Sequence, residues 1–341
     1  MTTHRSVDEM WLDVLGTLSA LTVPQVESRA GPSAEVLGYS AVLSDLDRTF
    51  LLNKCRNLSP TYAAAELLWY LSGEDSLERL RPYAPSYSRF AEGDRAWGAY
   101  GHRWWADPTF LAESKQNPYG QICMAVELLL SRPTTRQCVV TAWNAGDLPH
   151  ALLGDKADLP CTLAWQFVRR EGKLHLVVTM RSEDAWLGLP YDVFVNTTMQ
   201  RLVAAQAGLE LGTYVHQVGC MHLYAANRQD AVKAFMPASA ADARDRSSAY
   251  RHSGGPRAAS VGWNSTAREY LSAQINCCLE AERRAREERS PMDEWYEDFA
   301  KKIQPSNPLH DVVLLCAAKW VPVGPNSLSS PLMREAYGAN R

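Results

Sequence analysis

The chain has 341 residues, of which 46% are hydrophobic and 21% charged, so it can bury a substantial core as an ordinary globular protein. Its formal net charge of −3 provides no global positive field, which argues against nucleic-acid or anionic-membrane partners. The N-terminal segment is acidic without a long apolar stretch, and no apolar run reaches the roughly 18 residues of a membrane span, so we expect a soluble, cytoplasmic protein.

The first half of the chain mixes helical and strand-like patterns. Helical spacing of apolar residues predicts an amphipathic helix over Val7–Leu21, and strand-like segments follow as far as Leu52. A helix that begins at a proline is predicted over Pro60–Ser72. Ser76–Thr109 is expected to be a loop whose many aromatic rings either plug the core or wall a planar ligand. The next predicted elements are a helix over Tyr119–Ser131 and a buried strand over Arg136–Trp143.

The second half is predicted to open with a β-hairpin over Leu163–Val178, because two strand-like runs flank a charged turn. Pro237–Pro256 contains little to bury and is expected to be a mobile loop, and the polar tail from Gly324 is expected to be loosely held. The other predicted elements are a helix over Val193–Leu209, one or two strands over Leu211–His222, helices over Ser265–Arg289 and Asp293–Ile303, and an apolar stretch over His310–Trp320.

The eight cysteines include no CxxC pair, and no histidine-rich ligand spacing accompanies them. This argues against a zinc site or a disulfide framework, and we expect no metal. Cys161 precedes the hairpin, and the run Met180–Asp192 follows it, so the hairpin would bring a thiol, an arginine and a carboxylate together. A lone cysteine is most often a small buried hydrophobe; the alternative is a nucleophile.

Glu66 is the one charge within the apolar run of the helix predicted over Pro60–Ser72. An unpaired buried carboxylate costs several kcal/mol or becomes protonated. Glu66 therefore either lies on the solvent-facing side of that helix, or is a catalytic carboxylate with a raised pKa in a pocket.

An ordered set of motifs covers the chain from Arg29 to Tyr224. The motifs are the Arg-x-Gly loop at Arg29, Glu66-Leu67-Leu68-Trp69, Tyr100-Gly101-x-x-Trp104, Arg136 followed by Ala142-Trp143-Asn144, Pro160-Cys161 with Gln166, Arg181-Ser182-x-Asp184-x-x-Leu187-Gly188-x-Pro190, and His222-Leu223-Tyr224. This set resembles the thymidylate synthase superfamily. The resemblance implies a single α+β domain over residues 1–341, with a mixed β-sheet flanked by helices and two such sheets packed back to back in a homodimer.

The resemblance also implies roles for these residues. Cys161 would add as a thiolate to C6 of a pyrimidine nucleotide, so that C5 attacks the one-carbon unit of 5,10-methylenetetrahydrofolate; neighbouring arginines would help to ionise the thiol. Glu66 would manage protons, helped by Tyr100. The phosphate would be held by Arg29, Arg181, Ser182 and, from the partner subunit, Arg136. Gln166, His222 and Tyr224 match ligands of the base and sugar, and Asp184 and Trp97 belong to the folate side.

Asp192 departs from the pattern, because synthases that act on dUMP have an asparagine there. Uracil presents an N3–H donor and an O4 acceptor, whereas cytosine presents an N3 acceptor and an N4 amino donor, which a protonated carboxyl can match. Mismatched buried groups cost roughly 1–3 kcal/mol each. The chain thus resembles the (deoxy)cytidylate 5-hydroxymethylases, with dCMP favoured over CMP. Glu66, alone or together with Asp192, would position the water that completes the hydroxymethyl group.

Other departures leave alternatives open. Thr162 and Cys220 stand where synthases usually have histidine and aspartate, Gln137 replaces a second arginine, and the segment after about Arg228 does not follow the family pattern. A thymidylate synthase-type or cytidylate C5-methylating enzyme is the first alternative. A catalytically idle nucleotide- or RNA-binding relative and a Cys161–His222 hydrolase are the others.

Overall fold

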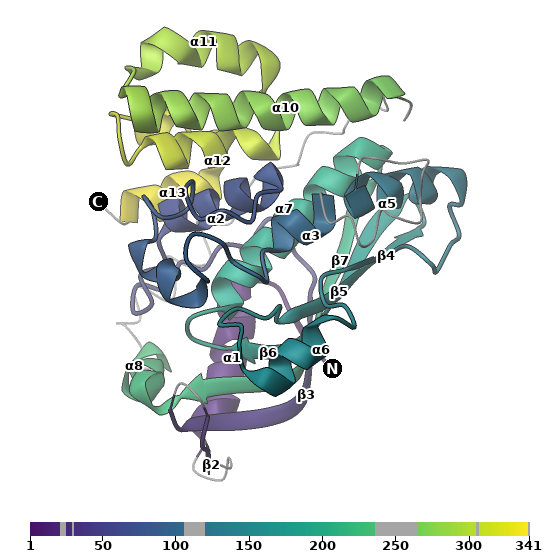
Figure 1. Cartoon of the computed structure of the whole chain (residues 1–341), viewed down its shortest axis with the longest axis vertical. Coiled ribbons are helices and arrows are strands. Elements are labelled where there is room, and N and C mark those ends of the chain that lie inside the picture. Colours follow the sequence, from purple (N-terminus) through teal and green to yellow (C-terminus); the bar gives the residue numbers. More distant parts are fainter. Residues whose placement is uncertain (21–24, 29–30, 106–119, 236–264, 305–306, 340–341) are drawn as a thin grey trace.

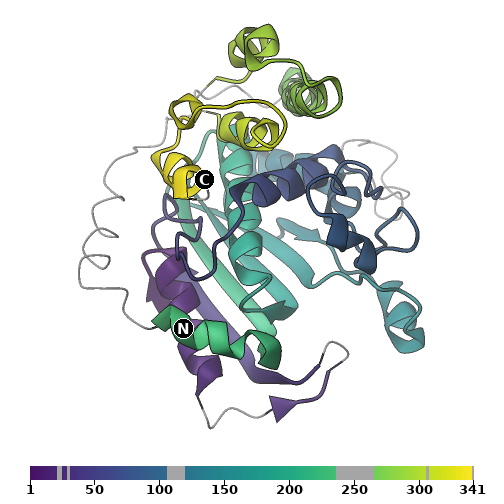
Figure 2. The same cartoon turned by 90° about the vertical axis from the view of Figure 1, so that its left-hand side faces the viewer.

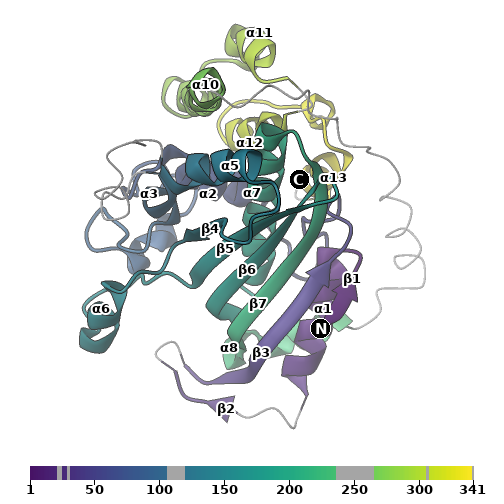
Figure 3. The same cartoon turned by 90° about the vertical axis from the view of Figure 1, so that its right-hand side faces the viewer.

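The computed structural model of the chain describes residues 1–20, 25–28, 31–105, 120–235, 265–304 and 307–339. It has a mixed β-sheet with helices packed against one face (Figure 1). Figure 2 shows these helices in front of the sheet, and Figure 3, from the opposite side, shows the strands in front. The predicted Arg29 phosphate ligand and the loop predicted over Pro237–Pro256 lie outside the described residues.

The strands run in the order β1-β3-β7-β6-β5-β4, with β2 paired to β3. They are β1 (Thr2–His4), β2 (Gln25–Val26), β3 (Ser33–Leu43), β4 (Val139–Thr141), β5 (Thr162–Arg170), β6 (Lys173–Asp184) and β7 (Glu210–Tyr224). β6 and β7 are parallel, as are β1 and β3, and the other neighbours are antiparallel. A parallel pair needs a crossover connection, and the long helix α7 (Leu189–Ala207) provides it.

The predicted hairpin is confirmed as β5 and β6. Its two-residue turn, Glu171 and Gly172, has positive φ at both positions (51° and 73°), as turns that match the twist of a hairpin require. The strand predicted over Arg136–Trp143 is shorter in the structure, where only β4 pairs with β5. The Ser76–Thr109 segment includes a 3₁₀ helix (Pro85–Phe90) and the short helix α3 (Tyr100–Trp105), so its described part is more ordered than the predicted loop.

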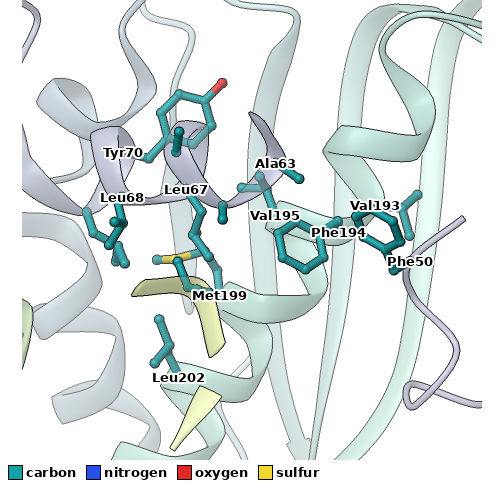
Figure 4. Packing of buried hydrophobic residues seen from close by; sticks show 14 of the residues in the cluster. Phe50, Ala63, Leu67, Leu68, Tyr70, Val193, Phe194, Val195, Met199 and Leu202 are labelled. Atoms are coloured by element: carbon teal, nitrogen blue, oxygen red, sulfur yellow. The ribbon is translucent and has the colours of Figure 1, made fainter. Parts of the chain in front are cut away.

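Helices α2 (Pro60–Ser72) and α7 form the layer beside the sheet. Figure 4 shows Leu67 of α2 beside Met199 of α7, with Phe194 and Phe50 in the same apolar cluster. α7 begins at Leu189 rather than at the predicted Val193, because Pro190 is suited to a first turn. The other helices of this part are α1 (Val7–Ser19), α5 (Gly120–Ser131), α6 (Asp147–Leu153) and α8 (Ala225–Phe235).

The C-terminal part is helical and packs on α2. It contains α10 (Ser265–Arg283), a π-helical turn (Arg284–Glu288), α11 (Met292–Lys302), α12 (Pro308–Ala317), a 3₁₀ turn (Pro325–Ser327) and α13 (Pro331–Ala339). Buried Glu282 accepts hydrogen bonds from Arg79 (2.8 Å), Tyr83 (2.8 Å) and Arg286 (2.7 Å), which ties α10 to the segment after α2. The expectation of a loosely held tail is wrong, since Met333, Ala336 and Tyr337 bury one face of α13.

Candidate active site

Cys161 lies half-buried at the start of β5, in a loop held from two sides. The Tyr100 hydroxyl accepts hydrogen bonds from the backbone N–H groups of Cys161 (2.9 Å) and Thr162 (3.1 Å). Arg181 Nε and Nη2 donate to the carbonyl oxygens of Pro160 (2.9 Å) and Leu159 (3.0 Å). The structure therefore brings the predicted thiol, arginine and tyrosine together. Tyr100 and Arg181 hold the backbone on either side of Cys161.

The ionisation of Cys161 differs from the expected one. Burial raises the pKa of the thiol to about 12, and the carboxyls of Glu183, Asp192 and Asp158 act in the same direction. The Arg181 guanidinium opposes this shift, as expected, but burial outweighs it. At neutral pH the protonated thiol therefore predominates.

Glu66 lies on the inner side of α2 and is only 7% exposed, so its placement on a solvent-facing side of the helix is excluded. The Tyr62 hydroxyl donates to Glu66 Oε1 at 2.8 Å, and Tyr70 is also hydrogen-bonded to this carboxyl. Burial and, secondly, the nearby Asp192 carboxyl raise the pKa of Glu66 to about 8. Glu66 is thus protonated at neutral pH and can release a proton near pH 8.

Asp192 lies in the first turn of α7, next to a buried carboxyl that the sequence reasoning missed. This neighbour is Glu183 on β6, which is 3% exposed and hydrogen-bonded to Asp192. Burial raises the pKa of Glu183 to about 8; burial and the Glu183 carboxyl raise that of Asp192 well above its usual range. The alternation of buried residues along β6 up to Met180 would place Ser182 on the inner face, so the strand period alone does not reveal Glu183.

Behind Glu183 lies a second buried polar group. His216 of β7 is fully buried, and its Nε2 lies 3.3 Å from Glu183 Oε2. Its Nδ1 lies 2.7 Å from the Tyr214 hydroxyl, which in turn accepts a hydrogen bond from Asn196 Nδ2 at 3.2 Å. Burial lowers the pKa of His216 to about 4, so the imidazole is neutral at pH 7.

The carboxyl ends of the parallel strands β6 and β7 bring another predicted group together. Ser182 Oγ lies 3.3 Å from His222 Nδ1, and the His222 ring packs edge-on against Tyr224 with a centroid distance of 5.0 Å. Asp184 pairs with His222 in the strand register. Asp184 Oδ1 accepts hydrogen bonds from the backbone N–H groups of Trp186 (2.8 Å) and Leu187 (3.0 Å). These contacts give His222 partners other than the Cys161 thiol.

Gln166 and Arg136 lie apart from these groups. Gln166 Nε2 donates to the Arg136 carbonyl oxygen at 2.9 Å, and the Arg136 side chain is exposed. Strand register places Gln166 between Val139 and Val177, on the face opposite to that of the neighbouring Trp165, which is buried under the helices. The structure therefore puts the Gln166 side chain, with the Arg136 carbonyl oxygen beside it, on the sheet face that none of the described helices covers (Figure 3).

Trp97 is held by a buried ion pair that the sequence reasoning also missed. Arg103 (4% exposed) donates to both carboxylate oxygens of Asp147 (0% exposed) at 2.7 and 2.8 Å, and Trp97 Nε1 donates to Asp147 Oδ1 at 3.0 Å. Burial alone would raise the pKa of Asp147, but the hydrogen bonds from Arg103 bring it below its usual range. Trp97 as a whole residue is 41% exposed, and Lys156 Nζ lies 4.9 Å from the centre of its ring.

A protein-family model described as thymidylate synthase matches residues 24–242, which is more than half of the chain. Among the described residues, no three histidine, cysteine, aspartate or glutamate side chains gather in a way that could hold a metal ion. None of the described helices has both the length and the apolar character needed to cross a membrane. The matched residues include the Cys161 loop, Glu66, Asp192 and the ends of β6 and β7. The chain belongs to the thymidylate synthase family, whose members are transferases that move a one-carbon unit from methylenetetrahydrofolate to a nucleotide.

Proposed function

We propose that this protein is a cytidylate 5-hydroxymethyltransferase that acts on dCMP in preference to CMP, with 5,10-methylenetetrahydrofolate and water as co-substrates. The observation that carries the proposal is the environment of Asp192. Burial and, secondly, the Glu183 carboxyl raise the pKa of Asp192 well above its usual range, which favours the neutral carboxyl. A neutral carboxyl offers one O–H donor and one carbonyl acceptor, which is the complement of cytosine N3 and its N4 amino group.

Cys161 is the proposed nucleophile toward C6 of the base, where its sulfur forms the covalent bond that makes C5 nucleophilic. The Tyr100 hydroxyl supports this step because it accepts hydrogen bonds from the backbone N–H groups of Cys161 and Thr162. These two hydrogen bonds fix the loop that carries the thiol. Glu66 is close enough to Asp192 for the Asp192 carboxyl to raise its pKa, so we assign both residues to one site. With a pKa of about 8, Glu66 can hold or release a proton for the water that becomes the hydroxyl group.

The folate supplies the one-carbon unit when it is bound. The residues proposed to hold it are Trp97, Lys156 and Asp184. An exposed indole ring with an ammonium group 4.9 Å from its centre fits a ligand that has both aromatic rings and carboxylates. The buried Arg103–Asp147 pair keeps the indole in one orientation, because Asp147 accepts the indole N–H.

The nucleotide phosphate is proposed to bind Arg29, Arg181 and Ser182, and the sugar to bind His222 and Tyr224. Two of the Arg181 nitrogens already donate to the Cys161 loop, so a phosphate on its remaining N–H groups would link nucleotide binding to the position of the thiol. The Ser182–His222 contact of 3.3 Å orients the imidazole toward the ends of β6 and β7.

A homodimer is proposed to form through the uncovered sheet face. A cross-strand row on this face runs through Val139, Gln166, Val177, Val215 and Val42, as the strand registers show. Val139, Val177 and Val215 are partly or fully exposed in the single chain, and a second sheet of the same kind would bury them; Val42 is already buried. The half-buried Gln166 side chain lies at this face and donates to the carbonyl oxygen of exposed Arg136, which suits the proposed contribution of Arg136 to the phosphate site of the partner.

The test is a substrate panel of dCMP, CMP, dUMP and UMP, each incubated with the protein and methylenetetrahydrofolate and analysed by product mass. We expect a 5-hydroxymethylated product from dCMP, a smaller amount from CMP, and no dihydrofolate. Cys161→Ser is the matched control and should give no product. Methylation of any substrate, with the absorbance rise of dihydrofolate formation, would contradict the proposal.

A further inference from the structure

The Glu66 carboxyl is held by a neighbouring tyrosine that has no role in the reaction proposed above. We propose that Tyr62 is a positioning residue: its hydroxyl fixes the orientation of the Glu66 carboxyl, so that this carboxyl takes a proton from the water that completes the hydroxymethyl group. This inference rests on the proposed function and names a residue that acts through Glu66 at the same site.

The first support is a direct hydrogen bond between the two side chains. The Tyr62 hydroxyl donates to Glu66 Oε1 at 2.8 Å. The two residues are four positions apart on α2, so they lie on the same face of the helix. The last torsion of a glutamate side chain is broad, and a carboxyl without a fixed partner has no single orientation. The hydrogen bond from Tyr62 removes this freedom.

The second support is that Tyr62 is itself fixed from two sides. Its backbone N–H donates at 3.1 Å to the side chain of Ser59, which is the N-cap of α2. Its ring packs edge-on against Tyr191, with a centroid distance of 4.7 Å and an interplanar angle of 79°. The Tyr191 hydroxyl in turn accepts the backbone N–H of Ser59 at 3.2 Å. The Tyr62 hydroxyl therefore holds Glu66 from a defined position.

The same pair of rings connects Glu66 to the residue proposed to read the base. Tyr191 and Asp192 are neighbours in the first turn of α7, where their backbone N–H groups donate to the Gly188 carbonyl oxygen at 2.9 and 3.0 Å. The contact between Tyr62 and Tyr191 thus joins α2 to the turn that carries Asp192. In this way the position of the Glu66 carboxyl is set relative to the bound base.

The hydrogen bond gives the two oxygens of Glu66 different tasks. Oε1 accepts the Tyr62 proton, and Oε2 of the carboxylate receives the proton of the water. In this step the water oxygen forms a bond to the methylene carbon on C5, and the electron pair of the exocyclic double bond moves into the ring. The sulfur of Cys161 then leaves C6 and the ring double bond reforms, so that the proton taken by Glu66 ends on the departing thiolate.

The test is the rate of hydroxymethyl product formation from dCMP in Tyr62→Phe, Glu66→Gln and the double variant. Tyr62→Phe removes the hydroxyl and keeps the ring against Tyr191. Its kcat should fall roughly tenfold or more, with KM for dCMP within about twofold, because a hydrogen bond to a charged group is lost in a step that follows binding. In the Glu66→Gln background the same substitution should change kcat by less than about twofold, since Tyr62 acts through Glu66.

A second readout distinguishes positioning of the water step from a general loss of activity. An added small thiol competes with water, because its sulfur can bond to the methylene carbon in place of the water oxygen and supplies its own proton. With 2-mercaptoethanol present, Tyr62→Phe should therefore give more 5-thioether product than the wild type. Tyr191→Phe is the matched control, because its hydroxyl contacts Ser59 and not Glu66, and should keep the wild-type kcat and product ratio.

Circular dichroism and thermal unfolding check that each variant is folded. If Tyr62→Phe fails to fold, Tyr62→Met, whose adaptable side chain also lacks a donor, takes its place with the same expectations. An unchanged kcat in the folded variant, an equal loss in the Glu66→Gln background, or an equal loss in Tyr191→Phe overturns the positioning role. Failure of the proposed function shows in the wild type instead, which would then yield a methylated nucleotide and dihydrofolate.

Discussion

The Asp192→Asn substitution tests how the base is read, because an amide can present either a donor or an acceptor to the pyrimidine ring. The amide side chain keeps the shape of Asp, and the backbone N–H of residue 192 stays bonded to the Gly188 carbonyl oxygen at 3.0 Å. What decides the orientation of the new amide is Glu183. A side-chain amide at this position that donates to Glu183 would favour the ionised form of the glutamate and lower its pKa. The amide oxygen then faces the base, where it accepts N3–H of uracil.

The expected change follows from the two edge groups of the base. Each mismatched buried group costs roughly 1–3 kcal/mol, so mismatch at both N3 and the exocyclic position changes the preference by at least about 30-fold. The assay is a competition between dCMP and dUMP, with the ratio of kcat/KM values taken from product masses at pH 8.5, where Glu183 is ionised. Asp192→Asn should favour dUMP, and the double variant Glu183→Gln/Asp192→Asn should discriminate less, because the amide introduced at position 183 can accept from the amide at position 192 or donate to it. An unchanged dCMP-to-dUMP ratio in Asp192→Asn would refute the reasoning.

Further predictions concern ionisation and the buried ion pair. Because burial raises the pKa of Glu66 from 4.5 to about 8, wild-type stability should fall as pH rises between these values. In urea unfolding, Glu66→Gln should lessen this fall in the free energy of unfolding by roughly 4 kcal/mol. The same pH dependence of the free energy of unfolding in both proteins would contradict this prediction. Cys161 should react slowly with iodoacetamide at pH 7.5 and faster as the pH rises to 11, because burial raises the pKa of its thiol to about 12. Peptide mapping distinguishes labelling of Cys161 from labelling of the exposed Cys55. Rapid labelling of Cys161 at pH 7 would count against the burial argument. Arg103→Met should destabilise the fold by about 3–5 kcal/mol because Asp147 is left buried and unpaired. The double variant Arg103→Met/Asp147→Leu should recover part of that loss; no recovery would show that the cost does not come from the unpaired charge.

Local patterns in the sequence were enough to predict several elements. The charged Arg-Arg-Glu-Gly-Lys run between two strand-like segments predicted the hairpin, because turn residues and a period of two are local properties. The proline start and apolar run of Pro60–Ser72 predicted α2 with its observed bounds. The ordered motifs also pointed to the family, since a resemblance depends only on residue identity and order. The tail was missed because its apolar residues, Met333, Ala336 and Tyr337, are few and were outweighed by its polar composition.

The chemistry of the site was decided by the tertiary structure. Glu183, Asp192 and His216 belong to β6, α7 and β7, and the parallel crossover brings them together from distant positions in the chain. Their pKa values depend on burial summed over the surrounding elements, which no local pattern encodes. Arg103 and Asp147 likewise meet across 44 residues. The sequence by itself predicted that Cys161, Glu66 and Asp192 are reactive residues, because the resemblance depends on residue identity and order. Only the fold decided that the neutral forms of the thiol and of both carboxyls are favoured, because desolvation disfavours each charged form.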